Sequence, residues 1–186
     1  MDLEQRIQRL EDIEAIRYLQ AKYQRCVDCR DFNVIAQLFT DDVVSSYGNG
    51  EMTYNGKENV IKFLMGAMNI DMPSAHMIHG GEIDIVDSTN AKAKWYLQDF
   101  LVHKKHNINI EGAAIYDVSY QKIDGVWKIK SIGYKRLYEY MDNCSQTQTA
   151  TLKKTTFLDD IKNANVEDLK GYDKAFYEFS MNGEKK

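Results

Sequence analysis

The hydrophobic pattern of this 186-residue chain changes its period at the only proline, Pro73. Before the proline, apolar side chains recur every three or four residues, which is typical of amphipathic helices. After it, apolar and polar side chains alternate, which is typical of half-buried strands. The first pattern predicts helices at about residues 2–28, 32–38 and 57–68, and the second predicts strands at about residues 76–86, 91–103, 107–121 and 126–138.

Two short segments with glycine predict tight turns. Gly48-Asn49-Gly50 separates the extended runs 43–47 and 52–54, and Asp124-Gly125 separates the last two predicted strands. Both are typical of hairpins. Helices followed by antiparallel strands predict the α+β class. We therefore expect a cone-shaped α+β barrel, in which three N-terminal helices pack on a curved, mainly antiparallel sheet and the interior can hold a ligand.

The length of the chain is sufficient for one domain with a substantial core, and a second full domain is not expected. We place this domain at residues 1–141. Polar residues increase after it, and apolar residues at helical spacing recur over about 156–180. Residues 142–186 are therefore expected to form a partly helical C-terminal extension.

Charge and cysteine content limit the partners and the compartment. A formal charge of -4 gives no basic surface for nucleic acid or an anionic membrane. The segment MDLEQRIQRLEDIEAIRYL is too charged for a signal peptide, and no apolar run is long enough to span a membrane. Three cysteines, an odd number, predict a reducing cytoplasm. The Cys26-x-x-Cys29 spacing falls at a helix end rather than after a strand, which disfavours redox chemistry.

Several polar residues occupy positions where the pattern predicts apolar ones. Asp99 alternates with Leu97 and Leu101, so its carboxylate is either a structural ion pair or a cavity group. Tyr23 lies on the apolar stripe of the first helix, as a core tyrosine commonly does. Asp28 falls at the end of that helix, where a negative charge opposes the helix dipole. On the last strand, alternation places Arg136 on one face with Ile132, Tyr134 and Tyr138. The pattern leaves the burial of Arg136 undecided, with a rim arginine as the simpler interpretation.

The stretch SAHMIHGGE holds two of the four histidines, His76 and His79. Residues three apart on a strand point to opposite faces, so the two rings are poorly placed to bind one metal ion. Alternation counted back from Ile83 and Ile85 puts His79 on the apolar face. A bulge at Gly80-Gly81 would instead turn His76 inward. The pattern alone does not choose between the two histidines.

Six segments in collinear order, spanning about residues 10–140, together resemble a known family. They are DIEAIRYLQAKYQRCVD, SSYGNGE, SAHMIHGGEI, KWYLQDFLV, GAAIYDVSYQKIDGVW and GYKRLYEY. The chain resembles the SnoaL-like branch of the nuclear transport factor two-like superfamily. Within this branch it is most similar to the bile acid 7α-dehydratases, and more distantly to the scytalone dehydratases. Departures at the glycine pair, in the HKKHN turn and in the longer tail put the substrate in question.

The resemblance implies a catalytic set, with His76 rather than His79 as the general base. The set comprises Tyr23 and Asp28 in KYQRCVD, His76 in SAHM, Asp99 in WYLQD, and Arg136 in GYKR. The implied reaction is a cofactor-independent removal of water from a hydroxylated 3-oxo-Δ4 steroid. Bile acid 7-dehydration is favoured, with 7α ahead of 7β configuration, and neither a metal nor a redox cofactor is expected.

The expected partner is an apolar polycyclic small molecule, with a CoA thioester as one form, and the resemblance implies a homo-oligomer, with a trimer favoured. Two alternatives remain at this stage, a non-catalytic binding module and a ketosteroid isomerase-like proton shuttle, because fold does not decide function. The residues predicted to contact substrate are Tyr47, Tyr54, Trp95, Leu97, Ala114 and Tyr116.

Overall fold

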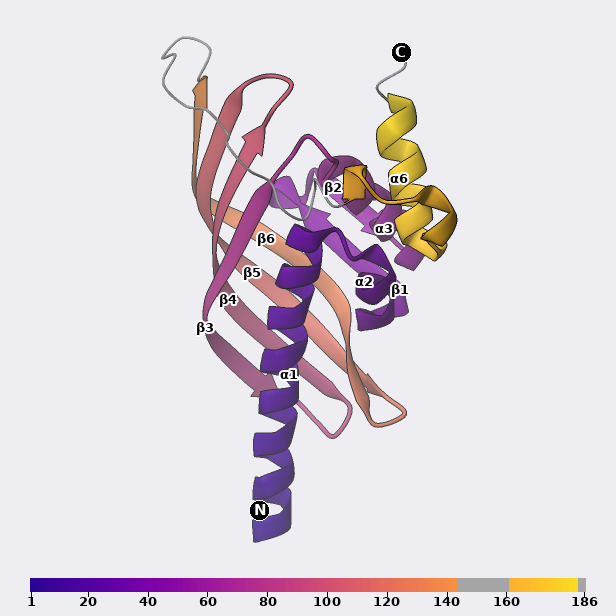
Figure 1. Cartoon of the computed structure of the whole chain (residues 1–186). Coiled ribbons are helices and arrows are strands. Elements are labelled where there is room, and N and C mark those ends of the chain that lie inside the picture. The colour runs from indigo at the N-terminus through magenta and orange to yellow at the C-terminus, as the bar shows by residue number, and fades with distance from the viewer. Residues whose placement is uncertain (144–160, 184–186) are drawn as a thin grey trace.

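A computed structural model of the protein describes residues 1–143 and 161–183 (Figure 1). It has the predicted α+β architecture, with helices on one side of a six-stranded sheet. The helices are α1 (Leu3–Cys29), α2 (Phe32–Leu38), α3 (Lys57–Ala67) and α6 (Gly171–Gly183), with 3-10 turns η1 (Gly48–Gly50) and η2 (Val166–Asp168). The strands are β1 (Phe39–Tyr47), β2 (Met52–Asn55), β3 (Ser74–Ile85), β4 (Asn90–His103), β5 (Ile108–Ile123) and β6 (Val126–Asn143).

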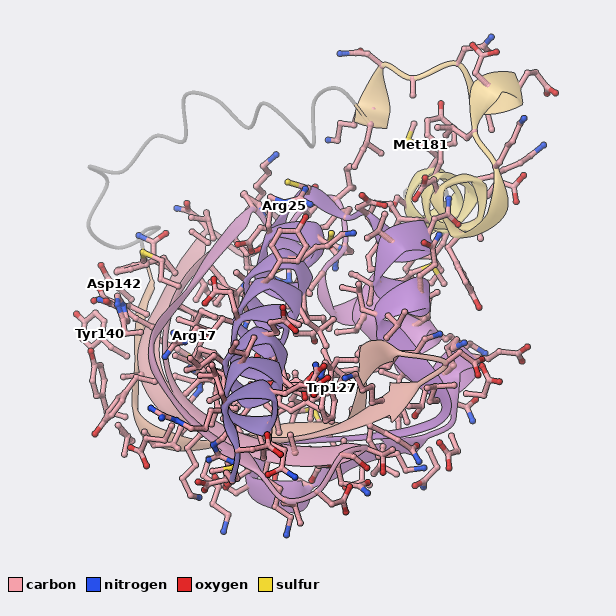
Figure 2. The ribbon with its side chains drawn as sticks, turned by 90° about the horizontal axis from the view of Figure 1, so that it is seen from below. Arg17, Arg25, Trp127, Tyr140, Asp142 and Met181 are labelled. Atoms are coloured by element: carbon pink, nitrogen blue, oxygen red, sulfur yellow. The ribbon has the colours of Figure 1, made fainter. Side chains whose placement is uncertain are left out.

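The sheet has the strand order β2-β1-β6-β5-β4-β3 and is mainly antiparallel. Only the β1–β6 pair is parallel among the described strands. The long strands curve around α1, as the view in Figure 2 shows. Asp124 and Gly125 both have positive φ, 50° and 79°, as a tight turn between twisted strands requires. The cone predicted from the sequence is therefore present, with α1 on its concave side.

Bulges in β3 and β6 change which side chains face inward. In β3 the register shifts between His79 and Gly81, and Gly80 between them has φ 52°. In β6 the register shifts so that Ala113 pairs with Tyr138 while Ala114 pairs with Arg136. Simple alternation along β6 placed Tyr138 on the face of Arg136, but Tyr138 is exposed. This interpretation was wrong because a bulge adds one residue to the strand, so that the residues after it face the opposite side from the one that alternation predicts.

The core begins part of the way along α1. Ile16 and Cys26 are fully buried, whereas Leu3, Ile7 and Leu10 are exposed. The first turns of α1 extend beyond the sheet (Figure 1), so the apolar stripe read from the sequence is buried only in its second half. No described helix has both the length and the apolar character needed to cross a membrane.

The buried carboxylate of Asp12 ties α1 to the β5–β6 hairpin. It accepts hydrogen bonds from Lys122 Nζ at 2.7 Å and from Trp127 Nε1 at 2.8 Å. Trp127 lies between α1 and the sheet (Figure 2). Burial alone would raise the pKa of Asp12, but these donors outweigh it and lower the pKa below its ordinary value.

We expect Asp12→Ala to lower the free energy of unfolding by about 1–3 kcal/mol, because it leaves the buried Trp127 donor without its acceptor. A carboxyl whose pKa is lowered on folding stabilises the protein above its unfolded pKa of about 3.9, and loses this contribution as the pH falls through the folded value. Urea unfolding at pH 7 and below pH 4 measures both effects. A variant as stable as the wild type at pH 7, or an unchanged gap at low pH, would contradict this account.

The described part of the C-terminal extension packs on α2. Phe176 of α6 is buried against Phe32, with ring centroids 4.9 Å apart. Asn33 Nδ2 donates to Asp173 Oδ2 at 2.8 Å. The predicted tail helix is present from Gly171, whereas residues 156–160 of that prediction lie outside the described residues. The boundary after residue 141 stays a prediction, and β6 continues past it to Asn143.

Candidate active site

A cavity of about 250 Å³ lies between α1, α3 and the concave face of the sheet. Its wall is mostly apolar and aromatic, with a histidine, two carboxylates and an arginine among the lining residues. The lining residues are Tyr23, Val27, Tyr47, Met52, Phe63, Leu64, Ala67, Met68, His76, Asp99, Leu101, Ile110, Tyr116, Tyr134, Arg136 and Glu139. Few convergent polar groups in an apolar cavity are typical of a small-molecule site.

His76 and Asp28 form a close pair at this cavity. His76 Nδ1 lies 2.6 Å from Asp28 Oδ1, and the backbone N–H of His76 donates to Asp28 Oδ2 at 2.8 Å. The His76 side chain is 8% exposed. The bulge at Gly80 turns His76 toward the cavity and leaves His79 exposed on the opposite face. An ionised carboxylate only accepts hydrogen bonds, so Nδ1 is the protonated ring nitrogen and Nε2 keeps its lone pair.

Two phenols from α1 and β1 meet inside the cavity. The hydroxyls of Tyr23 and Tyr47 lie 3.3 Å apart. Burial raises the pKa of Tyr23 well above its usual value, with neighbouring tyrosines adding to the effect, and burial raises the pKa of Tyr47 to about 12. Burial also raises the pKa of Tyr116, whose ring lies edge-on to Tyr134 at 5.5 Å. These hydroxyls therefore remain protonated at neutral pH and can donate hydrogen bonds.

Asp99 and Arg136 form a two-pronged ion pair across the sheet. Arg136 Nη1 and Nη2 donate to the two Asp99 oxygens at 2.6 and 2.8 Å. Arg136 Nε also lies 3.0 Å from Glu139 Oε2. Burial lowers the pKa of Arg136, but the hydrogen bonds and charge of Asp99 outweigh it and raise the pKa above its usual value. The sequence left open whether Asp99 is an ion pair or a cavity group, and it is both.

Glycine at position 112 makes room for this pair. Arg136 on β6 reaches Asp99 on β4 by crossing β5 at Gly112, and a Cβ there would lie 2.7 Å from Arg136 Nη1. Pairing in the sheet sets His76 opposite Asp99, Asp99 opposite Gly112, and Gly112 opposite Glu139. The polar groups of the site on the sheet thus lie along one cross-strand row, with the Arg136 guanidinium lying over it.

The five residues predicted as catalytic come together at this site. Tyr23, His76, Asp99 and Arg136 line the cavity, and Asp28 contacts the His76 ring. Of the residues predicted to contact substrate, Tyr47 and Tyr116 line the cavity. The remaining four, Tyr54, Trp95, Leu97 and Ala114, are not among its lining residues.

These four residues have other surroundings. Tyr54 stacks on Phe63, with ring centroids 4.3 Å apart, so it supports a lining residue from behind. Trp95 Nε1 donates to the Tyr120 hydroxyl deeper in the core. Leu97 and Ala114 pair with each other one row below Asp99 and Gly112, and both are buried in the core beneath the cavity. Alternation selects the inward face correctly, but it does not say how deep the cavity reaches.

Two polar lining residues were missed in the sequence. Tyr134 was assigned to the face of Arg136 without a role, and its ring lies 4.9 Å from the Arg136 guanidinium carbon. Glu139 was not considered, because it follows the bulge that reverses the phase of β6. Within the described residues, no group of three or more His, Cys, Asp or Glu side chains is placed to hold a metal ion.

Comparison with known proteins gives one family and several similar folds. The family described as the SnoaL-like domain matches residues 8–132. A candidate scytalone dehydratase from Novosphingobium aromaticivorans has a TM-score of 0.67 and 22% identity, over 72% of this chain and 89% of that one. The hexachlorocyclohexane dehydrochlorinase LinA-type3 from Novosphingobium barchaimii has a TM-score of 0.66 and 23% identity, over 73% and 92%.

A third similar structure is an NTF2-like protein with a cystatin-like fold, also from Novosphingobium aromaticivorans. Its TM-score is 0.62 and its identity 20%, over 73% of this chain and 88% of that one. At such identities the three structures establish a shared fold. The SnoaL-like resemblance inferred from the sequence is confirmed by the family match, and the three structures have the fold that the resemblance implies.

Proposed function

Since this chain belongs to the SnoaL-like family, we propose that it is a hydro-lyase that removes water from a hydroxylated, apolar, polycyclic ketone without a metal or redox cofactor. The observation that carries the proposal is the His76–Asp28 pair at an apolar cavity that also holds the Tyr23 hydroxyl. Elimination of water next to a ketone needs a base for the acidic proton and a donor to the developing negative charge. A histidine oriented by a carboxylate can be that base, and a neutral phenol can be that donor.

The substrate favoured by the sequence resemblance is a 3-oxo-Δ4 steroid with a hydroxyl at carbon 7. His76 Nε2 takes a proton from carbon 6, which the conjugated ketone makes acidic. The carbon 6–hydrogen electron pair enters the conjugated system, and the carbon 7–oxygen bond breaks as a new double bond forms. The departing hydroxide receives a proton from the His76 imidazolium and leaves as water, which returns the ring to its neutral form. Asp28 stabilises the imidazolium formed in the first step and holds the neutral ring in the tautomer that keeps the lone pair on Nε2.

Tyr23 is the proposed donor to the negative charge that develops on the ketone oxygen or the departing hydroxyl. Its raised pKa keeps the phenol protonated, and Tyr47 lies close enough to support its orientation. One donor aimed at developing charge in a cavity of this kind contributes about 3 kcal/mol to transition-state stabilisation.

The charges at the cavity favour a substrate whose inserted end is neutral. Asp99 and Glu139 share the single guanidinium of Arg136, and Asp28 lies behind His76. A free carboxylate entering this cavity would meet like charge, which disfavours binding. A bile acid would therefore enter with its ring system first and keep its acid or CoA thioester end outside. The cavity volume of 250 Å³ is just below the range of about 300–1,000 Å³ typical of ligand sites, which supports partial insertion.

Incubation with 3-oxo-Δ4 bile acid CoA thioesters of 7α and 7β configuration tests this function. Dehydration lengthens the conjugated chromophore and removes the mass of one water molecule, and we expect the 7α compound to react. Binding with neither change would support a carrier instead. A shifted double bond with the hydroxyl retained would support an isomerase. Free acids run in parallel report whether the CoA moiety is required.

We further propose a homotrimer formed through the convex face of the sheet. Met77, Tyr96 and Phe100 are exposed there on β3 and β4, beside the half-buried Ile115 of β5. An exposed apolar patch on a folded domain is typical of an interaction surface.

The trimer predicts a mass near three times 21.6 kDa by size-exclusion chromatography with light scattering. Tyr96→Asp with Phe100→Asp should release monomers, because charge is depleted at the centres of such interfaces. Tyr18→Asp is the matched control, since Tyr18 is an exposed tyrosine on α1, away from this face. A monomeric wild type, or equal dissociation in the control, would contradict the proposed interface.

A further inference from the structure

The side chain of Arg30 is buried beneath the His76–Asp28 pair. Arg30 follows α1 directly and has φ 61°, a left-handed conformation in which glycine is the usual residue. The residue is only 2% exposed, and the side chain turns back under the helix end. An arginine in a conformation that favours glycine, with its charge removed from water, indicates that the guanidinium has a specific task.

The guanidinium contacts the start of β3 and the end of α1 together. Nη1 donates to the carbonyl oxygens of Val27 and Asp28 at 2.8 and 2.9 Å, and to Ser74 Oγ at 2.9 Å. Nη2 donates to the carbonyl oxygen of Met72. Burial lowers the pKa of Arg30 to about 10, against the attraction of Asp28, so it is still a cation at neutral pH. Arg30 therefore holds β3 against the helix end that bears Asp28.

The donor and the acceptor of each of these hydrogen bonds are fixed. Arginine donates and never accepts, so the bond from Arg30 occupies a lone pair of Ser74 Oγ. The single hydroxyl proton of Ser74 is then free to point to Asp28 Oδ1, 2.8 Å away. Asp28 Oδ1 thus accepts from Ser74 as well as from His76 Nδ1, while Oδ2 accepts from the His76 backbone. Every oxygen of Asp28 accepts, and none is left to donate.

We propose that Ser74 and Arg30 are positioning residues, which hold Asp28 as an acceptor and so keep the His76 proton on Nδ1 and the lone pair on Nε2. This role rests on the proposed function only for its use in catalysis, because the tautomer is a property of the protein without substrate. Neither residue belongs to the catalytic set that the sequence resemblance implies. Their effect reaches the reacting atoms through Asp28 and His76.

The same contacts fix the direction of the Asp28 carboxylate, whose side chain is 21% exposed. Without the Ser74 hydroxyl, the carboxylate can turn partly toward solvent, so His76 Nδ1–H loses its acceptor for part of the time. The neutral ring can then carry its proton on Nε2 instead. The other polar groups around His76 stay in place in a Ser74 variant: Tyr23 of α1, Asp99 of β4, Tyr116 of β5, and Arg136 and Glu139 of β6.

Long-range proton–nitrogen NMR correlation of the imidazole rings tests the proposal without any substrate. In the full-length wild type, the His76 ring should show a protonated Nδ1. In Ser74→Ala, we expect a fraction of the Nε2-protonated form to appear, because Asp28 is no longer held as the acceptor of Nδ1–H. Ser74→Thr, which keeps a hydroxyl, should restore the wild-type behaviour. The exposed His79 serves as an internal reference in every sample, and Ser119→Ala on β5 is a matched control.

Arg30→Lys is the second variant, because lysine keeps the charge but loses the planar fork that spans the four acceptors. It should show a tautomer mixture like that of Ser74→Ala. If this variant does not fold, the Ser74→Ala spectrum alone tests the proposal. A wild-type His76 protonated at Nε2, or a Ser74→Ala spectrum with an unchanged tautomer, would overturn the proposal.

Turnover measurements distinguish a failure of this proposal from a failure of the proposed function. If the wild type dehydrates the substrate, Ser74→Ala should lower kcat several-fold with little change in KM, and Ser74→Thr should restore kcat. If the wild type is inactive, the proposed function fails while the NMR result stands. An unchanged kcat in Ser74→Ala, with an active wild type, would refute the positioning role in catalysis.

Discussion

His76→Ala should lose about 10²–10⁴-fold in kcat, the contribution typical of a positioned general base. The ring is removed while the partners of Asp28 on its other sides, Ser74 Oγ and the backbone N–H of residue 76, are retained. The fold should therefore survive, and near-UV circular dichroism with a thermal melt checks that it does. Turnover of the dehydration substrate, followed by the extended chromophore, measures the loss.

The matched control is His79→Ala, three residues along the same strand. His79 is exposed on the opposite face, so its removal should change kcat by less than about twofold, as is usual for surface positions that contribute little. Equal losses in the two variants would mean that neither ring is the base. Full activity in His76→Ala would remove the proposed mechanism altogether.

Arg136→Ala should cause a large loss of stability. Asp99 is 2% exposed and would keep its carboxylate in the interior without its cation, and breaking a buried ion pair from one side costs about 3–5 kcal/mol. Glu139, 43% exposed in its side chain, can turn to solvent when Arg136 is absent, so it contributes little to this cost. Urea unfolding at neutral pH gives the free energy directly.

A double variant distinguishes the cost of the lone carboxylate from lost packing. Asp99→Leu with Arg136→Met removes both charges and keeps side-chain volume, so it should recover most of the stability lost in Arg136→Ala. It should nevertheless stay poorly active, since the polar row of the site is gone. If Arg136→Ala unfolds like the wild type, or the double variant is less stable than Arg136→Ala, the pair does not have the energetic role assigned to it.

Much of the fold could be predicted because its signals are local. The second helix begins at Phe32 and ends at Leu38 as expected, and the long strands differ from their predicted bounds by a few residues at most ends. Asp124-Gly125 specifies its own turn, since both residues adopt positive φ. Such features depend on residues close together in the chain, which a pattern can represent.

The site was harder to predict because two of its determinants are interruptions of a pattern. At Gly80-Gly81 the two glycines have separate uses. Gly80 supplies the positive φ of the bulge, while a Cβ on Gly81 would lie 2.4 Å from a ring atom of Trp95. The sequence permits a bulge there but does not require one, so His76 could be chosen over His79 only through resemblance. In β6 no glycine marks the bulge that brings Glu139 inward.

Arg30 shows a different limit of sequence reasoning. Its signal is an arginine directly after a long helix, at a position where glycine is common, and a surface arginine is the ordinary interpretation of that signal. Only tertiary contacts from Met72 and Ser74, more than forty residues away, give it a buried environment. The local sequence pattern does not reveal a residue whose role depends on contacts with residues far away in the chain.

The cross-strand row that runs from His76 through Asp99 and Gly112 to Glu139 has a consequence for how the protein can diversify. The neighbouring row toward the β4–β5 turn contains Leu101 opposite Ile110, and both line the cavity with apolar side chains. Because pairing keeps successive rows separate, the shape of the cavity can be altered at Leu101 and Ile110 while the proposed acid–base residues stay unchanged. Selectivity for a new ring system or stereoisomer can then evolve without rebuilding the reaction.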